Sequence, residues 1–132
     1  MTFKPEVPKP HFTIWPEYGR SFLWINTSGT DALRGGPYSK EVAKLERSIS
    51  KSLMSRLEDW QLVYECNAYE STEEGGGRPY DWKTFHTVGI HLAVQLKEEL
   101  GDRARVFYEK PMEDPNNHLN QRREVLVDGQ LI

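Results

Sequence analysis

The chain of 132 residues carries a net charge of −3, and this length predicts one domain whose folding buries roughly two-thirds of the unfolded surface. Its content of 37% hydrophobic and 28% charged residues argues against a disordered chain. The single cysteine, Cys66, excludes an intramolecular disulfide, and the lack of a signal-peptide run or an apolar stretch of about 20 residues predicts a cytoplasmic protein.

The first elements in the chain are an arm and two strands. Residues 1–10 hold three prolines among charged residues, which predicts a flexible arm before a single α+β domain at 11–132. The runs HFTIWP (11–16) and SFLWIN (21–26) are aromatic and β-branched, and a turn at 17–20 separates them. This pattern predicts two strands joined as a hairpin.

A loop and a helical region follow. Residues 27–37 contain three glycines and a proline, which predicts a loop. Over 38–67, apolar residues recur at intervals of three and four and define one helical stripe. Ser50 is a suitable N-cap, so this region forms either one helix or two with a break near Ser48, the firmer helix lying at 50–67. The stripe consists of Val42, Leu45, Ile49, Leu53, Leu57, Trp60 and Tyr64.

The next segment is acidic and rich in glycine. Residues 69–80 combine glutamates with three consecutive glycines and a proline, which predicts an exposed, mobile loop. Asp81 is a suitable N-cap for a second helix, and Gly101 stands where a helix commonly stops. The core face of this helix consists of Trp82, Phe85, Gly89, Leu92, Ala93, Leu96 and Leu100.

The last part of the chain predicts one more strand. Residues 103–110 have a Val-Phe-Tyr centre typical of a strand, and 111–123 is polar and rich in turn residues. Val125 to Val127, Asp128-Gly129 and then Leu131-Ile132 indicate a short hairpin. The predicted fold class is α+β in the order ββααβ, with or without the C-terminal hairpin. Two helices are expected to pack on one face of a mostly antiparallel sheet.

The four histidines are the first candidates for acid–base or metal chemistry. His86 and His91 lie roughly 140° apart around one helix, which does not suit two ligands of one metal ion. His11 and His118 stand in no ligand pattern, and the adjacent carboxylates of the chain point apart from each other. We therefore expect hydrogen-bonded or surface histidines, with no metal, no cofactor and no catalytic residue. The enzyme alternative is a small hydrolase that uses His86 or His91 with a carboxylate.

Other residues that could bear chemistry have simpler interpretations. Gly75-Gly76-Gly77 lacks the Lys-Ser/Thr of a phosphate-binding loop, and Cys66 is expected to be a buried, inert thiol. Trp60 and Trp82 belong to the two helical stripes. Trp15 and Trp24 remain interface candidates, and self-association through either of them would make the chain a structural or adaptor subunit.

Charge is unevenly distributed along the chain. Residues 57–81 hold seven acidic residues and one arginine, a net charge of −6, which leaves +3 on the remainder. An acidic surface favours a basic partner and repels nucleic acid. Neither a nucleic-acid partner nor a membrane is expected.

Three segments resemble a family of small bacterial immunity proteins from contact-dependent growth inhibition and other polymorphic toxin systems. They are Ile14 to Gly19 followed by Leu23-Trp24; Ile49-Ser50 with Leu53, Leu57, Trp60 and Tyr64; and the stripe from Trp82 to Leu100-Gly101 leading into Val106.

The resemblance implies a protein that neutralises a co-produced toxin, often a nuclease, by blocking its active site. The acidic segment fits such a partner, because nuclease toxins are commonly basic. Glu70, Glu73 and Glu74 are the expected charge contacts, and Tyr69 and Tyr80 are the expected aromatic anchors. The oligomeric state stays open.

Overall fold

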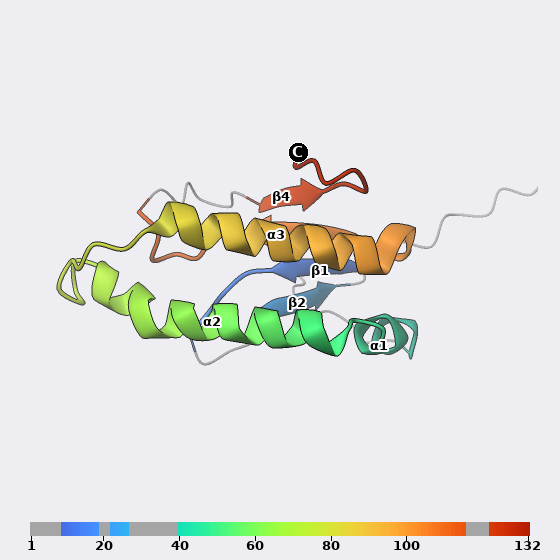
Figure 1. The fold of residues 1–132 in the computed structure, drawn as a ribbon, viewed down its shortest axis with the longest axis horizontal. Helices are drawn as coiled ribbons and strands as arrows, with labels where there is room; N and C mark the ends of the chain where they lie inside the picture. Colours follow the sequence, from blue (N-terminus) through green and yellow to red (C-terminus); the bar gives the residue numbers. More distant parts are fainter. Residues whose placement is uncertain (1–8, 19–21, 27–39, 116–121) are drawn as a thin grey trace, which may run out of the picture.

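The computed structural model describes residues 9–18, 22–26, 40–115 and 122–132, with strands, helices and one sheet (Figure 1). Most of the predicted arm and the loop at 27–37 lie outside these residues, as does His118. The boundary between an arm at 1–10 and a domain at 11–132 therefore stays a prediction. Among the described residues, no helix is long and apolar enough to cross a membrane.

The structure is α+β, as predicted, with a four-stranded sheet in the order β2-β1-β3-β4. β1 is antiparallel to β2 and parallel to β3, and β3 is antiparallel to β4, so the sheet is mixed. The parallel pair follows from the helices between β1 and β3, because parallel neighbours need a long crossover. The elements are β1 (His11–Ile14), β2 (Leu23–Asn26), α1 (Lys40–Arg47), α2 (Lys51–Ser71), α3 (Trp82–Leu100), a 3-10 helix (Gly101–Arg103), β3 (Arg105–Glu109) and β4 (Arg122–Val125).

The long helical region is two helices, broken where the sequence indicated. α1 ends at Arg47, and Ser50 caps α2 because its hydroxyl accepts a hydrogen bond from the Leu53 amide at 3.1 Å. The Ser50 amide and hydroxyl both donate to the Glu99 carboxylate of α3, each at 2.7 Å. These bonds fix the start of α2 against the end of α3.

The end of α2 differs from the prediction. The helix continues to Ser71 rather than stopping at 67, so Tyr69 and Glu70 lie on its last turn and not in the loop. Ala68 is fully buried in the core, which holds this extra turn against the rest of the structure. The Thr72 amide then donates to the Tyr69 carbonyl and closes the helix.

The second long helix and the last strands were largely predicted. Asp81 caps α3 by accepting from the Thr84 amide at 3.1 Å, and Gly101 ends it with a φ of +58°. The C-terminal hairpin is present but short: Val125 bridges Leu131 across a turn that contains Gly129. Its first strand is β4, which ends at Val125, so the prediction of a strand starting there was wrong.

The two long helices lie side by side on one face of the sheet (Figure 1). All residues of both predicted helical stripes are buried, which confirms that spacing alone identified the core face. Gly89 allows the closest approach, because a Cβ there would lie 2.6 Å from both Trp60 Cζ2 and Tyr108 Cε2. The apolar stripe of each helix thus packs against the sheet, and the opposite side of each helix faces solvent.

Candidate functional site

The acidic loop after α2 is exposed, as predicted. Glu73 and Glu74 in this loop, and Glu70 on the last turn of α2, all lie on the surface. The loop is held by backbone bonds from Gly77 to the Thr72 carbonyl at 2.7 Å and from Arg78 to the Glu70 carbonyl at 2.8 Å. Its triple glycine has a physical role, because Gly76 and Gly77 adopt φ angles of +111° and +68° that side chains disfavour.

One cation lies within this acidic surface. The Arg78 guanidinium Nη1 is 3.3 Å from Glu70 Oε2, and both side chains are more than half exposed. An exposed pair of this kind stabilises a fold weakly, by about 0.2–1 kcal/mol. Its larger effect is on surface charge, since Arg78 offsets one of the nearby carboxylates.

Tyr69 is exposed at 54% and lies beside a second tyrosine that the sequence did not single out. The Tyr69 amide donates to the Tyr18 hydroxyl, and the Tyr18 ring packs on Tyr64 with centroids 5.0 Å apart. Burial is the main cause that raises the pKa of Tyr18, and the carboxylate of Glu113 adds to it. Tyr18 therefore stays neutral and presents a ring, 40% exposed, next to the acidic surface.

The same tyrosine connects Trp15 to the acidic surface. Trp15 lines a depression of about 220 Å³ with Tyr18, Met112 and Glu113, and Tyr18 also lines a second depression with Tyr69 and Glu70. Trp15 is half-buried, and its indole Nε1 donates to the Lys110 carbonyl at 3.1 Å. The structure thus brings Trp15, Tyr69 and Glu70 to one end of the molecule.

Trp24 and Cys66 are also placed by the structure. The Trp24 indole donates to the Trp15 carbonyl at 3.0 Å, so its N–H group is already hydrogen-bonded within the protein. Cys66 is exposed on α2, and the expectation of a buried thiol was wrong. The buried side of α2 carries Tyr64 and Ala68 here, and Cys66, two residues from each, lies on the opposite side of the helix.

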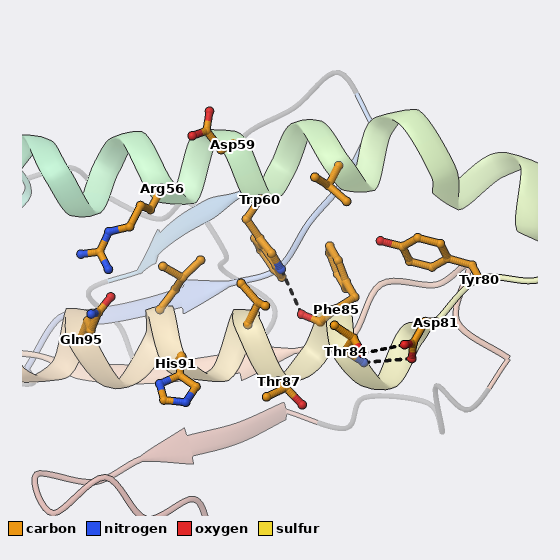
Figure 2. A pocket seen from close by; sticks show the side chains of 13 residues that line it. Arg56, Asp59, Trp60, Tyr80, Asp81, Thr84, Phe85, Thr87, His91 and Gln95 are labelled. Carbon is orange, nitrogen blue, oxygen red and sulfur yellow. Dashed lines mark hydrogen bonds between the residues drawn. The ribbon is translucent and has the colours of Figure 1, made fainter.

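Tyr80 lies on the other side of the acidic loop, at one end of a groove between α2 and α3 (Figure 2). The groove has a volume of about 700 Å³. Its floor is formed by Trp60 and Phe85, whose rings stack at 4.6 Å and 12°. Val63 and Val88, exposed at 46% and 45%, stand on its two sides.

His86 is buried in a polar cluster that the sequence could not show. Its Nε2 lies 2.6 Å from Asp114 Oδ2, and its Nδ1 lies 2.6 Å from the Tyr108 hydroxyl. Burial is the main cause that lowers the pKa of His86, although Asp114 opposes it. The neutral imidazole then donates from Nε2 to the carboxylate and accepts at Nδ1 from the hydroxyl.

This cluster contains a hydrogen-bonded histidine, as expected from the sequence. Both nitrogens of His86 are engaged, and burial raises the pKa of the Tyr108 hydroxyl well above its ordinary value. The adjoining cavity has no serine or cysteine among the described residues that line it. The Thr87 hydroxyl, which also lines it, donates to the Lys83 carbonyl.

His11 and His91, the other two histidines that the structure describes, do not add to this cluster. His91 is exposed on α3 and lines the groove. His11 lies in β1 between the guanidinium groups of Arg105 and Arg122. Within the described part of the chain, no group of three or more histidine, cysteine or acidic residues could hold a metal ion.

Comparison with known protein families identifies a family for this chain. A family model described as Serratia CdiI immunity protein-like matches residues 10–111. No curated protein and no solved structure matches the chain. The matched range includes all three segments of the resemblance, together with the acidic loop, both sides of the groove and Trp15.

Proposed function

The chain belongs to the Serratia CdiI immunity protein-like family, and from this premise we propose that it binds and neutralises a cognate protein toxin without acting as an enzyme. The resemblance found in the sequence is confirmed at the level of the family. We propose in addition which kind of toxin it binds and through which surface.

The observation that carries the proposal is the acidic surface at the end of α2 and in the following loop. Glu70, Glu73 and Glu74 are exposed together, and exposed tyrosine rings lie beside them. A nuclease must be basic where it binds the phosphate backbone, so carboxylates can occupy that site as mimics of phosphate. Charge of opposite sign also speeds the encounter of the two proteins.

Aromatic anchors would supply the part of the affinity that does not depend on salt. The Tyr69 amide donates to the Tyr18 hydroxyl, and the Tyr18 ring packs on Tyr64, so the Tyr18 ring is held before the partner arrives. A side chain that is already fixed loses little conformational entropy on binding. Trp15 stands next to Tyr18 and extends the same surface. We propose that carboxylates steer the toxin and that these rings hold it, while access to its active site is blocked.

The test uses the toxin domain encoded beside the gene for this chain. The triple variant Glu70→Lys, Glu73→Lys and Glu74→Lys should slow association at least tenfold at low salt, and the loss should shrink as salt screens the charges. A matched triple variant, Glu98→Lys, Asp102→Lys and Asp128→Lys, changes the net charge equally on exposed positions elsewhere. It should bind nearly as the unmodified protein does.

Three results would count against the proposal. If the unmodified chain does not bind the toxin domain, the immunity function is wrong. If both triple variants lose the same affinity, overall charge matters and the acidic surface has no special part. Tight, salt-insensitive binding by the first variant would likewise remove that surface from the interface.

A further inference from the structure

The groove between α2 and α3 is built from a second stripe on each helix, on the side away from the sheet. On α2 the lining residues Arg56, Asp59 and Val63 recur at intervals of three and four. On α3 the lining residues Thr84, Val88, His91 and Gln95 do the same. Such spacing places each set along one line of its helix. Figure 2 shows Arg56 between the two helices, with Asp59 and His91 at the outer edges of the groove.

The floor of the groove offers apolar contact and few hydrogen bonds. The Trp60 indole donates to the Phe85 carbonyl at 3.1 Å, so its polar atom is already used within the protein. The Thr84 hydroxyl donates to Asp81 Oδ2 at 2.6 Å. A ligand that enters here gains most by burying apolar groups against Trp60, Phe85 and the two valines.

The two ends of the groove differ in charge, and a third charged residue, Asp59, lies on the outer edge of α2. Arg56 and Gln95 line one end, and Tyr80 and Asp81 line the other, as Figure 2 shows. Bonds from the Thr84 hydroxyl and amide lower the pKa of Asp81, so this carboxylate stays ionised. Charge complementarity therefore favours a ligand that is basic near Asp81, acidic near Arg56 and apolar between them.

The size of the groove fits one short helix. From Thr84 to Gln95 the lining of α3 extends about 16 Å, at 1.5 Å per residue, which is about three helical turns. Two helices lying side by side offer a groove in which the side-chain ridges of a third can pack. Such a helix would insert apolar side chains from positions i, i+4 and i+7.

We propose that this groove receives an amphipathic helix of the toxin, with its apolar stripe on Trp60 and Phe85, a basic residue near Asp81 and an acidic residue near Arg56. The identity of the partner rests on the proposed function, whereas the chemistry of the helix rests on the groove. Tyr80 borders both the groove and the acidic loop, so one partner could contact the two surfaces together.

Substitutions on the sides of the groove test this docking. Val63→Glu and Val88→Glu each put a carboxylate beside the apolar floor, and both positions are nearly half exposed, so the fold should persist. Each should raise the Kd for the toxin domain at least tenfold, mainly through faster dissociation. Val127→Glu is the matched control, because Val127 is 65% exposed and lies outside the groove.

A separate variant tests the direction in which the toxin helix lies in the groove. Arg56→Glu keeps an exposed helical position and reverses the charge at one end of the groove. It should weaken the complex several-fold, and a toxin helix with the opposing charge reversed should restore the affinity. Thermal unfolding of every variant, followed by circular dichroism, shows whether the fold is retained. If the toxin binds folded Val63→Glu and Val88→Glu as tightly as the unmodified chain, the docking is overturned and the proposed function stands.

A second measurement applies if the unmodified chain does not bind the toxin domain. The probe is a synthetic helical peptide with leucines in one stripe, lysine at one end and glutamate at the other. Its control is the same peptide with serine for leucine. Leucine-dependent shifts of the Trp60 indole N–H in NMR spectra would support the groove as a helix-binding site, while the proposed function fails. No shift, or equal shifts with both peptides, would overturn the groove.

Discussion

The imidazole Nε2 of His86 lies 2.6 Å from the carboxylate Oδ2 of Asp114, and both side chains are almost completely buried. Asp114→Ala removes the acceptor and leaves a buried N–H without its partner, which costs about 1–3 kcal/mol. We expect the free energy of unfolding to fall by about 2 kcal/mol, as measured by urea denaturation at pH 7. Asp102→Ala is the control, because Asp102 is exposed, and it should change stability by less than about 0.5 kcal/mol.

The same pair separates a structural histidine from a catalytic one. A structural role predicts that Asp114→Ala destabilises the chain in proportion to its lost hydrogen bond. It also predicts that toxin binding by the folded variant is unchanged, since the side chains of His86 and Asp114 are buried. A hydrolytic activity of the unmodified chain that Asp114→Ala abolishes without loss of stability would contradict this role.

Acid should destabilise the protein through His11. Burial is the main cause that lowers the pKa of His11 to about 4, and the guanidinium groups of Arg105 and Arg122 add to it, while Glu124 opposes them. An unfolded histidine has a pKa near 6.5, so the unfolded chain binds the proton more readily. The contribution to stability is complete above pH 6.5 and is lost as the pH falls toward 4. The loss amounts to about 3 kcal/mol.

A variant that lacks the His11 imidazole isolates this effect. The unfolding free energy of His11→Gln should fall less steeply between pH 6.5 and 4 than that of the unmodified chain, in parallel urea titrations. His86 remains in both proteins, so its own titration cancels in the difference. His91→Gln, at an exposed position, is the control for the loss of a histidine as such. Equal slopes for His11→Gln and the unmodified chain would show that His11 does not titrate as its burial requires.

Local features of the fold could be predicted because they depend on residues close in sequence. The caps at Ser50 and Asp81 bond amides three residues away, and Gly101 ends α3 through its own backbone angle. The buried stripes follow from spacing alone. The extension of α2 to Ser71 was not predicted. Burial of Ala68 in the core holds the extra turn, and no capping residue in the sequence indicates it.

Features that join distant segments could not be predicted from one sequence. The parallel pairing of β1 with β3 depends on how the chain returns across the sheet. Tyr18 meets Tyr69 across 51 residues, and His86 meets Asp114 across 28. The groove was missed for the same reason: each outer stripe mixes polar and apolar residues and resembles an ordinary solvent face until the two helices lie together.

Gly89 is the point where the helices and sheet lie closest. A Cβ at this position would lie 2.6 Å from Trp60 Cζ2 and 2.8 Å from the Tyr108 hydroxyl, so neighbouring rings must move. Gly89→Ala should therefore destabilise the chain by about 1–3 kcal/mol, although alanine favours a helix by about 1 kcal/mol. Glu98→Ala, at an exposed position on α3, should stay within about 0.5 kcal/mol of the unmodified chain in thermal unfolding. A Gly89→Ala protein as stable as the control would show that the packing can relax.

Arg78 offers a substitution that should improve binding. Its guanidinium lies 3.3 Å from Glu70 and offsets one carboxylate of the acidic surface. Arg78→Ala should raise the association rate with a basic toxin domain several-fold at low salt, and the gain should vanish at high salt. Stability should change by less than about 1 kcal/mol, because the pair is exposed.

Lys51→Ala removes an equal charge from an exposed position at the other end of α2 and should leave the rate nearly unchanged. Stopped-flow kinetics would distinguish the two. A slower rate for Arg78→Ala would place Arg78 itself in contact with the partner and would contradict an interface that works through its carboxylates.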